Sequence, residues 1–225
     1  MTSLVARATA GTLFVLIAMG ALLFLTAGTL SYWQAWVYLA LFAASSSAII
    51  AYLVRKDPAL LERRIRGGAT AEKATSQQIA STIASIGFIA IFAVSGLGQR
   101  FHWSTLPLTV TIAGNVLFLV GWAIVFFVFK ENSFASATIE VASDQRVVST
   151  GPYAIVRHPM YSGSLLYVLG TPLALGSWWG FLGVLLMMPA VVWRLLDEER
   201  FLVKNLPGYS EYEERVKYRL IPRAW

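Results

Sequence analysis

The segment GPYAIVRHPMYSG, residues 151–163, places an arginine, a histidine and two tyrosines beside a hydrophobic run. A second polar group, the acidic triplet Asp197, Glu198 and Glu199, follows the same run. Carboxylates can hold an ammonium group or bridge two ribose hydroxyls, and an arginine fork can pair with a carboxylate. Aromatic faces can stack on a purine or contact a sulfonium cation. These residue types indicate a pocket for a zwitterionic or nucleotide-like ligand.

The run between the two groups predicts a hairpin that brings them together. It covers Met160–Trp193 without a charged residue, and the Gly-Ser-Trp-Trp sequence at 176–179 interrupts it as a tight turn. Each arm is roughly 25 Å long at 1.5 Å per residue. An antiparallel hairpin therefore returns the acidic triplet to the level of the Arg-His pair. The mouth is polar with an apolar floor, the usual form of a small-molecule pocket.

The rest of the sequence is that of an integral membrane protein. Of its 225 residues, 57% are hydrophobic and 13% are charged, whereas about a quarter of a soluble domain is charged. Four further uncharged runs have the roughly 20-residue length of a membrane-spanning helix: Ala8–Leu30, Trp33–Val54, Gln78–Gly98 and Pro107–Phe129. We expect an all-α fold with about six transmembrane helices, five to six in number. The last two could form a crossing or a re-entrant hairpin.

Charge placement predicts the orientation. With six spans, the N-terminus, the 55–77 and 130–159 loops and the C-terminal tail share one side, which holds 17 of the 18 Lys and Arg residues. The positive-inside rule puts this side, with both termini and the pocket, in the cytoplasm; we expect a bacterial inner membrane. All 12 acidic residues lie there too. Nucleic-acid binding is therefore a poor interpretation of the net charge of +6, and contact with anionic lipid headgroups is a better one.

The chain divides into a four-helix scaffold, residues 1–129, and a cofactor-binding region, residues 130–225. The first run is too long for a signal peptide, so we interpret it as a retained helix. The second region combines the long polar loop, the helical hairpin 160–193 and a helical tail that closes the pocket on the cytosolic side.

Two short helices are expected on the polar side. In the 55–77 loop, Asp57-Pro58 is a start signal and Gly67-Gly68 a stop signal, so we predict an amphipathic surface helix without a chemical role. In the tail, a Pro-Gly turn precedes Ser210 and Glu213, which form a capping-box pattern. We interpret Asp197 as a surface residue.

Several kinds of chemistry are excluded. The chain has no cysteine, so it has no disulfide, no thiolate nucleophile and no thiolate metal site. His102 belongs to the short outer loop and His158 to the opposite side, so they cannot form a two-histidine metal centre. The spans contain no ionisable residue, which disfavours an ion-coupled transporter.

Three linked motifs resemble the isoprenylcysteine carboxyl methyltransferase family and the wider group of membrane phospholipid methyltransferases. They are GPYAIVRHPMYSG, DEERFL, and GYSEYEERVKYRLIP in the tail. The resemblance covers about the last hundred residues, and the first four spans match only as generic hydrophobic helices. In the eukaryotic members the tail glycine lies farther from the first tyrosine than Gly208 does from Tyr209.

The resemblance implies S-adenosylmethionine as cofactor and S-adenosylhomocysteine as product. It implies a cytosol-facing pocket, which a lipophilic or lipidated substrate reaches from the bilayer. From the residues themselves we expect no metal. Arg157 and Glu199 are the expected catalytic residues. The expected cofactor-binding positions are Tyr153, Arg157, His158, Pro159, Tyr161, Gly163, Glu198, Glu199, Tyr209, Tyr212, Arg219, Leu220 and Pro222.

The expected reaction is direct methyl transfer to a lipophilic acceptor, such as a prenylcysteine-like carboxylate. Alignment of the reacting atoms and exclusion of water would supply most of the catalysis. One alternative is a phospholipid or amine N-methyltransferase, in which His158 or Glu199 would act as the base. Another is a membrane NADPH-dependent reductase with a similar C-terminal layout.

Overall fold

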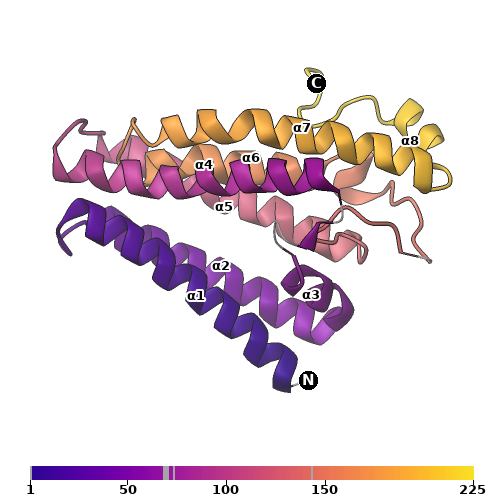
Figure 1. Ribbon diagram of the computed structural model, residues 1–225, viewed down its shortest axis with the longest axis horizontal. Helices are drawn as coiled ribbons and strands as arrows, with labels where there is room; N and C mark the ends of the chain where they lie inside the picture. Colours follow the sequence, from indigo (N-terminus) through magenta and orange to yellow (C-terminus); the bar gives the residue numbers. More distant parts are fainter. Residues whose placement is uncertain (1, 68–70, 73, 143) are drawn as a thin grey trace.

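The computed structural model describes residues 2–67, 71–72, 74–142 and 144–225, and its regular elements there are all helical. Figure 1 shows their arrangement. The expected all-α fold is confirmed. The elements are α1 (Thr2–Ala27), α2 (Trp33–Lys56), α3 (Pro58–Ile65), α4 (Thr75–Arg100), α5 (Leu108–Glu131), the 3₁₀ helix η2 (Gly151–Ala154), α6 (Pro159–Ala174), α7 (Phe181–Asn205) and α8 (Tyr209–Arg215).

The chain is an integral membrane protein. In its described part, four helices are long and apolar enough to cross a membrane: α1, α2, α4 and α5. The expected hairpin is present as α6 and α7, but α6 has 16 residues, about 24 Å at 1.5 Å per residue and short of a ~30 Å hydrocarbon core. The second half of α7 is charged from Arg194 onward. The count of six spans is therefore not confirmed.

Local signals explain where the helices begin and end. Helix α1 ends at Ala27, three residues before the expected Leu30, because Gly28 adopts a left-handed φ of 68°. The predicted start of α3 is confirmed, since the Asp57 carboxylate accepts a hydrogen bond from the Leu60 amide at 2.9 Å. The expected capping box of α8 is wrong. Its N-cap is Gly208, with a φ of 82° and no side-chain cap.

Glycines let two helix pairs approach backbone to backbone. Helix α5 packs along α6, and α4 packs along α7. A Cβ atom built on Gly121 would lie 2.5 Å from the carbonyl oxygen of Gly163, and one on Gly183 would lie 2.6 Å from that of Gly87. Small residues at helix interfaces are typical of membrane proteins, where close van der Waals packing drives association.

The polar elements gather at one end of the bundle. In Figure 1, α3, α8 and the loop after α5 lie at the same end, where α1 and α2 diverge from the other long helices. Farther along, aromatic side chains hold α2 against the rest: Tyr38 is fully buried beside Phe118, and its hydroxyl lies 3.0 Å from Thr171 Oγ1 of α6. The bundle is thus tightly packed in its middle and open at its polar end.

Candidate functional site

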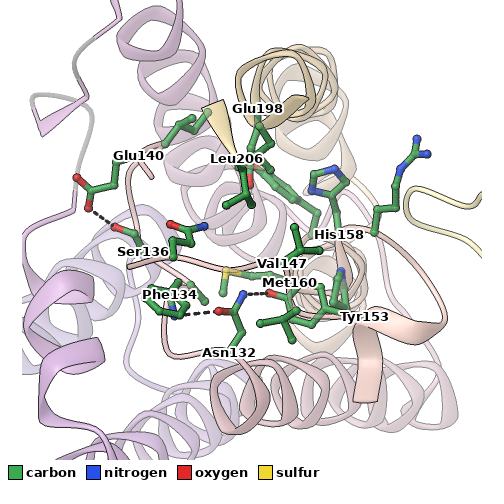
Figure 2. Close-up of a pocket in the computed structure, with 18 of the residues that line it drawn as sticks. Asn132, Phe134, Ser136, Glu140, Val147, Tyr153, His158, Met160, Glu198 and Leu206 are labelled. Carbon is green, nitrogen blue, oxygen red and sulfur yellow. Dashed lines mark hydrogen bonds between the residues drawn. The ribbon is translucent and has the colours of Figure 1, made fainter. Parts of the chain in front are cut away.

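A cavity of about 270 Å³ lies at the polar end of the bundle. Its walls are the beginning of α6, the charged half of α7, the helix α8 and the loop from Asn132 to Val148. Figure 2 shows side chains from α6, α7 and this loop converging on it. The expected return of the acidic residues to the level of the Arg-His pair is confirmed, because the Tyr161 hydroxyl donates to Glu198 Oε2 at 2.7 Å.

Eight of the positions expected to bind a cofactor line this cavity. The structure brings together residues from the motif before α6, from α7 and from α8: Tyr153, Arg157, His158, Pro159, Tyr161, Glu198, Tyr209 and Tyr212. Tyr212 also fastens α8 to the motif, since its hydroxyl donates to the carbonyl oxygen of Tyr153 at 2.8 Å.

A buried carboxylate, Glu199, joins three cationic or imidazole side chains behind the cavity wall. Its Oε1 atom lies 2.8 Å from Arg157 Nε and 3.2 Å from His158 Nε2, and its Oε2 atom lies 2.7 Å from Arg219 Nε. Arg157 also pairs with Glu213 of α8, at 3.1 Å. The network therefore ties α6, α7, α8 and the tail into one unit.

The surroundings of Glu199 hold its pKa at about 2, below the ordinary 4.5. Burial alone would raise this pKa. Hydrogen bonds from His158 and Arg219, together with the charges of His158 and Arg157, outweigh that effect and favour the ionised form. Glu199 is thus a permanent anion at neutral pH and the electrostatic centre of the network.

The C-terminal tail lies along the start of α6 and pairs with it through main-chain atoms. The Arg157 amide donates to the Tyr218 carbonyl at 2.8 Å, and the His158 amide donates to the Arg219 carbonyl at 3.0 Å. Ser162 Oγ donates to the Leu220 carbonyl at 2.6 Å. These bonds satisfy backbone groups that precede the helix, and they fix the direction in which the motif enters α6.

Five other expected cofactor-binding positions do not line the cavity: Gly163, Glu199, Arg219, Leu220 and Pro222. Gly163, one of the expected cofactor-binding positions, faces Gly121 of α5. Leu220 and Pro222 lie beside a separate apolar hollow formed with α5 and α6. The tail pairs with the start of α6, so Arg219, Leu220 and Pro222 support the cavity wall and do not line its interior.

The loop after α5 supplies residues that the motifs did not indicate. Asn132 donates to the Tyr153 hydroxyl at 2.9 Å, and Ser136 donates to Glu140 Oε1 at 3.0 Å. Figure 2 shows Asn132, Ser136 and Glu140 on the loop side of the cavity, across from Glu198. The length and polarity of the 130–159 loop were the available signals for this role.

A second ion pair holds this loop against α7. Glu72 pairs with Arg194 at 2.5 Å, and its other oxygen accepts a hydrogen bond from the Ile139 amide at 3.2 Å. Asp197, expected on the surface, is half-buried and accepts from Gln77 at 2.9 Å. The connection after α3 therefore has a structural role that the sequence did not reveal.

The cavity tyrosines are protonated at neutral pH. Burial raises the pKa of Tyr161 well above its ordinary value, and the neighbouring Glu198 charge raises it further. Burial likewise raises the pKa of Tyr153 to about 12. Both phenols can therefore donate hydrogen bonds, and neither is an anionic nucleophile.

An apolar groove of about 400 Å³ adjoins the polar cavity. It lies among α1, α2, α3, α5 and α6, and side chains such as Leu53, Trp122 and Phe129 line it. Three residues line both spaces: Arg64, Met160 and Ser164. The two spaces thus meet at the start of α6. Within the described ranges, no group of three or more His, Asp or Glu side chains is placed to hold a metal ion.

The chain is similar in sequence to a known protein family and to several characterised proteins. The family model described as phospholipid methyltransferase matches residues 109–207. The chain is similar to the protein-S-isoprenylcysteine O-methyltransferase B of Arabidopsis thaliana, with 30% identity over 146 residues, covering 61% of this chain and 70% of the relative. It is also similar to the protein-S-isoprenylcysteine O-methyltransferase of Schizosaccharomyces pombe, with 37% identity over 79 residues, 32% of each chain.

A third similarity is to a Delta(14)-sterol reductase of Mus musculus, with 34% identity over 91 residues, which is 39% of this chain and 22% of the relative. The chain spans less than half the length of three of the curated relatives it matches, and 70% of the Arabidopsis protein.

Proposed function

Because this chain belongs to the protein-S-isoprenylcysteine O-methyltransferase family of membrane proteins, we propose that it transfers a methyl group from S-adenosylmethionine to a lipophilic acceptor. One observation carries the proposal: a polar cavity lined by carboxylates and tyrosines meets an apolar groove within the same helix bundle. Such a pair of spaces suits a polar cofactor and a lipid-soluble acceptor that meet at their junction.

The residues of the polar cavity fit S-adenosylmethionine. Glu198 and Glu140 are carboxylates suited to an ammonium group or to ribose hydroxyls, and the protonated tyrosines offer donors and aromatic faces. The Tyr209 hydroxyl is buried without a hydrogen-bond partner among the described residues, as expected of a group that awaits a ligand. When bound, the cofactor supplies an electrophilic methyl group on a sulfonium and leaves as S-adenosylhomocysteine.

The side chains behind the wall position the site. Arg157 lines the cavity, but Glu199 and Glu213 hold its Nε and Nη1 atoms. We therefore assign Arg157 and Glu199, the residues expected to be catalytic, to holding the motif, α7 and the tail in register. His158 shares Glu199 and has the same task. Fixed geometry and exclusion of water are the main contributions that a protein makes to methyl transfer.

The acceptor enters from the lipid through the apolar groove. The groove is bounded by α1, α2 and α5, all candidate membrane spans. A prenylcysteine-like carboxylate is already ionised and needs no base. A phospholipid amine is the alternative acceptor, and it must lose a proton, for which His158 would have to leave its contact with Glu199.

The proposed orientation places both termini and the polar cavity in the cytoplasm, since 17 of the 18 Lys and Arg residues belong to that side. The chain has no cysteine, so single cysteines can report its topology. A membrane-impermeant maleimide should label Thr105→Cys in intact cells and Ser210→Cys only after lysis. The reverse pattern would overturn the orientation.

Binding of S-adenosylhomocysteine to the detergent-purified protein, measured by calorimetry, tests the proposed cofactor. We expect micromolar binding, and a loss of roughly tenfold to a hundredfold in affinity for Glu198→Gln, because hydrogen bonds to charged groups are worth about 1.5–3 kcal/mol. Glu214→Gln, an exposed carboxylate on α8, is the matched control. Absence of binding to a folded sample would refute the proposal.

A second candidate function, a membrane reductase, is favoured by the similarity to the sterol reductase over 91 residues. The same calorimetric experiment with NADPH separates the two candidates. Binding of NADPH without binding of S-adenosylhomocysteine would favour the reductase. We expect the opposite result.

A further inference from the structure

Arg64 lies at the junction of the two spaces. It belongs to α3, the short surface helix to which the sequence assigned no chemistry, and it lines both the polar cavity and the apolar groove. Met160 and Ser164 of α6 line the same junction. A molecule that reaches from the groove into the cavity must therefore pass the Arg64 side chain.

Only part of the hydrogen-bonding capacity of the Arg64 guanidinium is satisfied by the described residues. Its Nη1 atom donates to the Ser136 carbonyl at 2.9 Å and contacts the Met160 sulfur at 3.6 Å. Its Cζ atom lies 5.1 Å from the centre of the Phe129 ring. Among the described residues, its Nε and Nη2 atoms have no hydrogen-bond acceptor and no carboxylate lies within ion-pair distance.

The other arginines at the cavity are either paired with carboxylates or, as Arg146 is, exposed to solvent. Arg157 is paired with Glu199 and Glu213, and Arg194 is paired with Glu72. Burial lowers the pKa of Arg64, and the nearby Arg194 charge lowers it as well. An arginine nevertheless keeps its charge in proteins, so Arg64 is a half-buried cation without a counter-charge among the described residues. A site that meets an anionic ligand would use such a cation.

We propose that Arg64 binds the anionic head group of the acceptor and thereby selects a carboxylate over a neutral or cationic acceptor. This inference rests on the proposed methyl transfer. The planar guanidinium can form a bidentate pair with a carboxylate. The acceptor's apolar part then lies in the groove, and its head group lies at the entrance of the polar cavity.

Methyl transfer to a carboxylate acceptor needs no base. Transfer to a carboxylate oxygen forms an O–CH₃ bond and breaks the S–CH₃ bond, whose electron pair stays on sulfur. The products are a neutral ester and a neutral thioether, and no proton is released. Because the ester no longer pairs with Arg64, it binds more weakly than the acid and returns to the bilayer. An amine acceptor would instead bring positive charge toward Arg64.

The test compares an acid with its own methyl ester. Equilibrium binding of N-acetyl-S-farnesylcysteine and of its methyl ester is measured on the detergent-purified full chain. We expect wild type to bind the acid at least about tenfold more tightly than the ester. The neutral variants Arg64→Gln and Arg64→Met should lose this preference, and Arg64→Lys should restore part of it.

Arg66→Gln is the matched control. Arg66 lies two residues away, is exposed, and pairs with Glu62 outside both spaces, so its removal should leave the acid-to-ester ratio unchanged. A variant that still binds S-adenosylhomocysteine is folded. The acid-to-ester affinity ratio of either neutral variant that passes this check tests the role of Arg64. An equal affinity of wild type for acid and ester, or a preference retained without the Arg64 charge, would overturn the inference. If wild type prefers the acid but does not bind S-adenosylhomocysteine, the proposed function fails and the anion site stands.

Discussion

The two adjoining spaces are built in different ways. The polar cavity has walls joined by ion pairs and hydrogen bonds, among them those of Glu199 with Arg157 and of Glu72 with Arg194. The groove is closed by aliphatic and aromatic contacts among α1, α2, α5 and α6. The cavity therefore has a fixed polar geometry suited to one ligand, whereas the groove defines its ligand mainly by apolar volume.

The largest expected effect follows from removing the centre of the ion-pair network. Glu199→Gln leaves Arg157 and Arg219 without their shared carboxylate, and breaking a buried pair typically costs about 3–5 kcal/mol. We expect a large fall in the free energy of unfolding, measured by thermal unfolding in detergent. Glu214→Gln on the exposed face of α8 should have little effect. An unchanged Glu199→Gln protein would show that the cavity wall does not depend on this network.

The same carboxylate gives a pH dependence. Because folding lowers the pKa of Glu199 from 4.5 to about 2, its stabilising contribution is fully present above pH 4.5. It is lost as the pH falls from 4.5 toward 2. Wild type should therefore lose stability over this window. Glu199→Gln should show a shallower dependence when both are followed by unfolding at successive pH values.

A substitution in the groove should have a smaller effect, on binding of the acceptor alone. A Cβ atom on Gly11 of α1 would have no neighbour within 4 Å, and this residue lines the groove. Gly11→Phe should fill part of the groove and weaken binding of a farnesylated acid by about tenfold, the loss of one to two kcal/mol of apolar contact. Its affinity for S-adenosylhomocysteine should not change.

Leu13→Phe provides the comparison for Gly11→Phe, because Leu13 is exposed on the outer surface of the same helix and lies outside the groove. Equal effects of the two substitutions on acid binding would contradict the assignment of the groove to the acceptor.

The smallest effect concerns two neighbouring tyrosines of the cavity. The Tyr212 hydroxyl donates to the Tyr153 carbonyl, whereas the Tyr209 hydroxyl has no partner among the described residues. Tyr212→Phe should lower stability by about 1 kcal/mol, and Tyr209→Phe should leave it nearly unchanged. Tyr209→Phe should instead weaken S-adenosylhomocysteine binding about fivefold, the value of one hydrogen bond. Thermal unfolding of the two variants measures the effect on stability, and calorimetry measures the effect on S-adenosylhomocysteine affinity.

The sequence predicted those contacts of the site that form between the two helices of the hairpin. The hairpin brought Tyr161 and Glu198 into contact because two helical arms of similar length return to the same level. Arg64, Glu72 and Arg194 were missed, since their roles depend on how α3 and the irregular loop after α5 fold back over the bundle. No periodicity encodes such contacts between distant segments.

The span count shows a related limit. An uncharged run of residues indicates that a segment is apolar, but it does not say whether lipid or other helices surround it. Helix α6 is short and lies along α5, with Gly163 facing Gly121, so its apolar residues serve helix packing as well as burial in the membrane. The tail positions Arg219, Leu220 and Pro222 do not line the cavity, because the tail pairs with the start of α6 instead.

The glycine contacts between α5 and α6 and between α4 and α7 also determine which parts of the protein can move. Helices in backbone contact cannot slide past one another without a steric clash, so each of these two pairs should behave as a rigid unit. The last turns of α1 are held to α4 in the same way, because a Cβ atom built on Gly96 would lie 2.8 Å from the Leu23 carbonyl oxygen. Widening of the groove must then come from α2, α3 and the first half of α1, which line it. In hydrogen–deuterium exchange, amides of α3 should exchange within minutes, while those around Gly121 should stay protected for hours. The gate through which lipid-borne molecules enter would therefore be the N-terminal third of the chain.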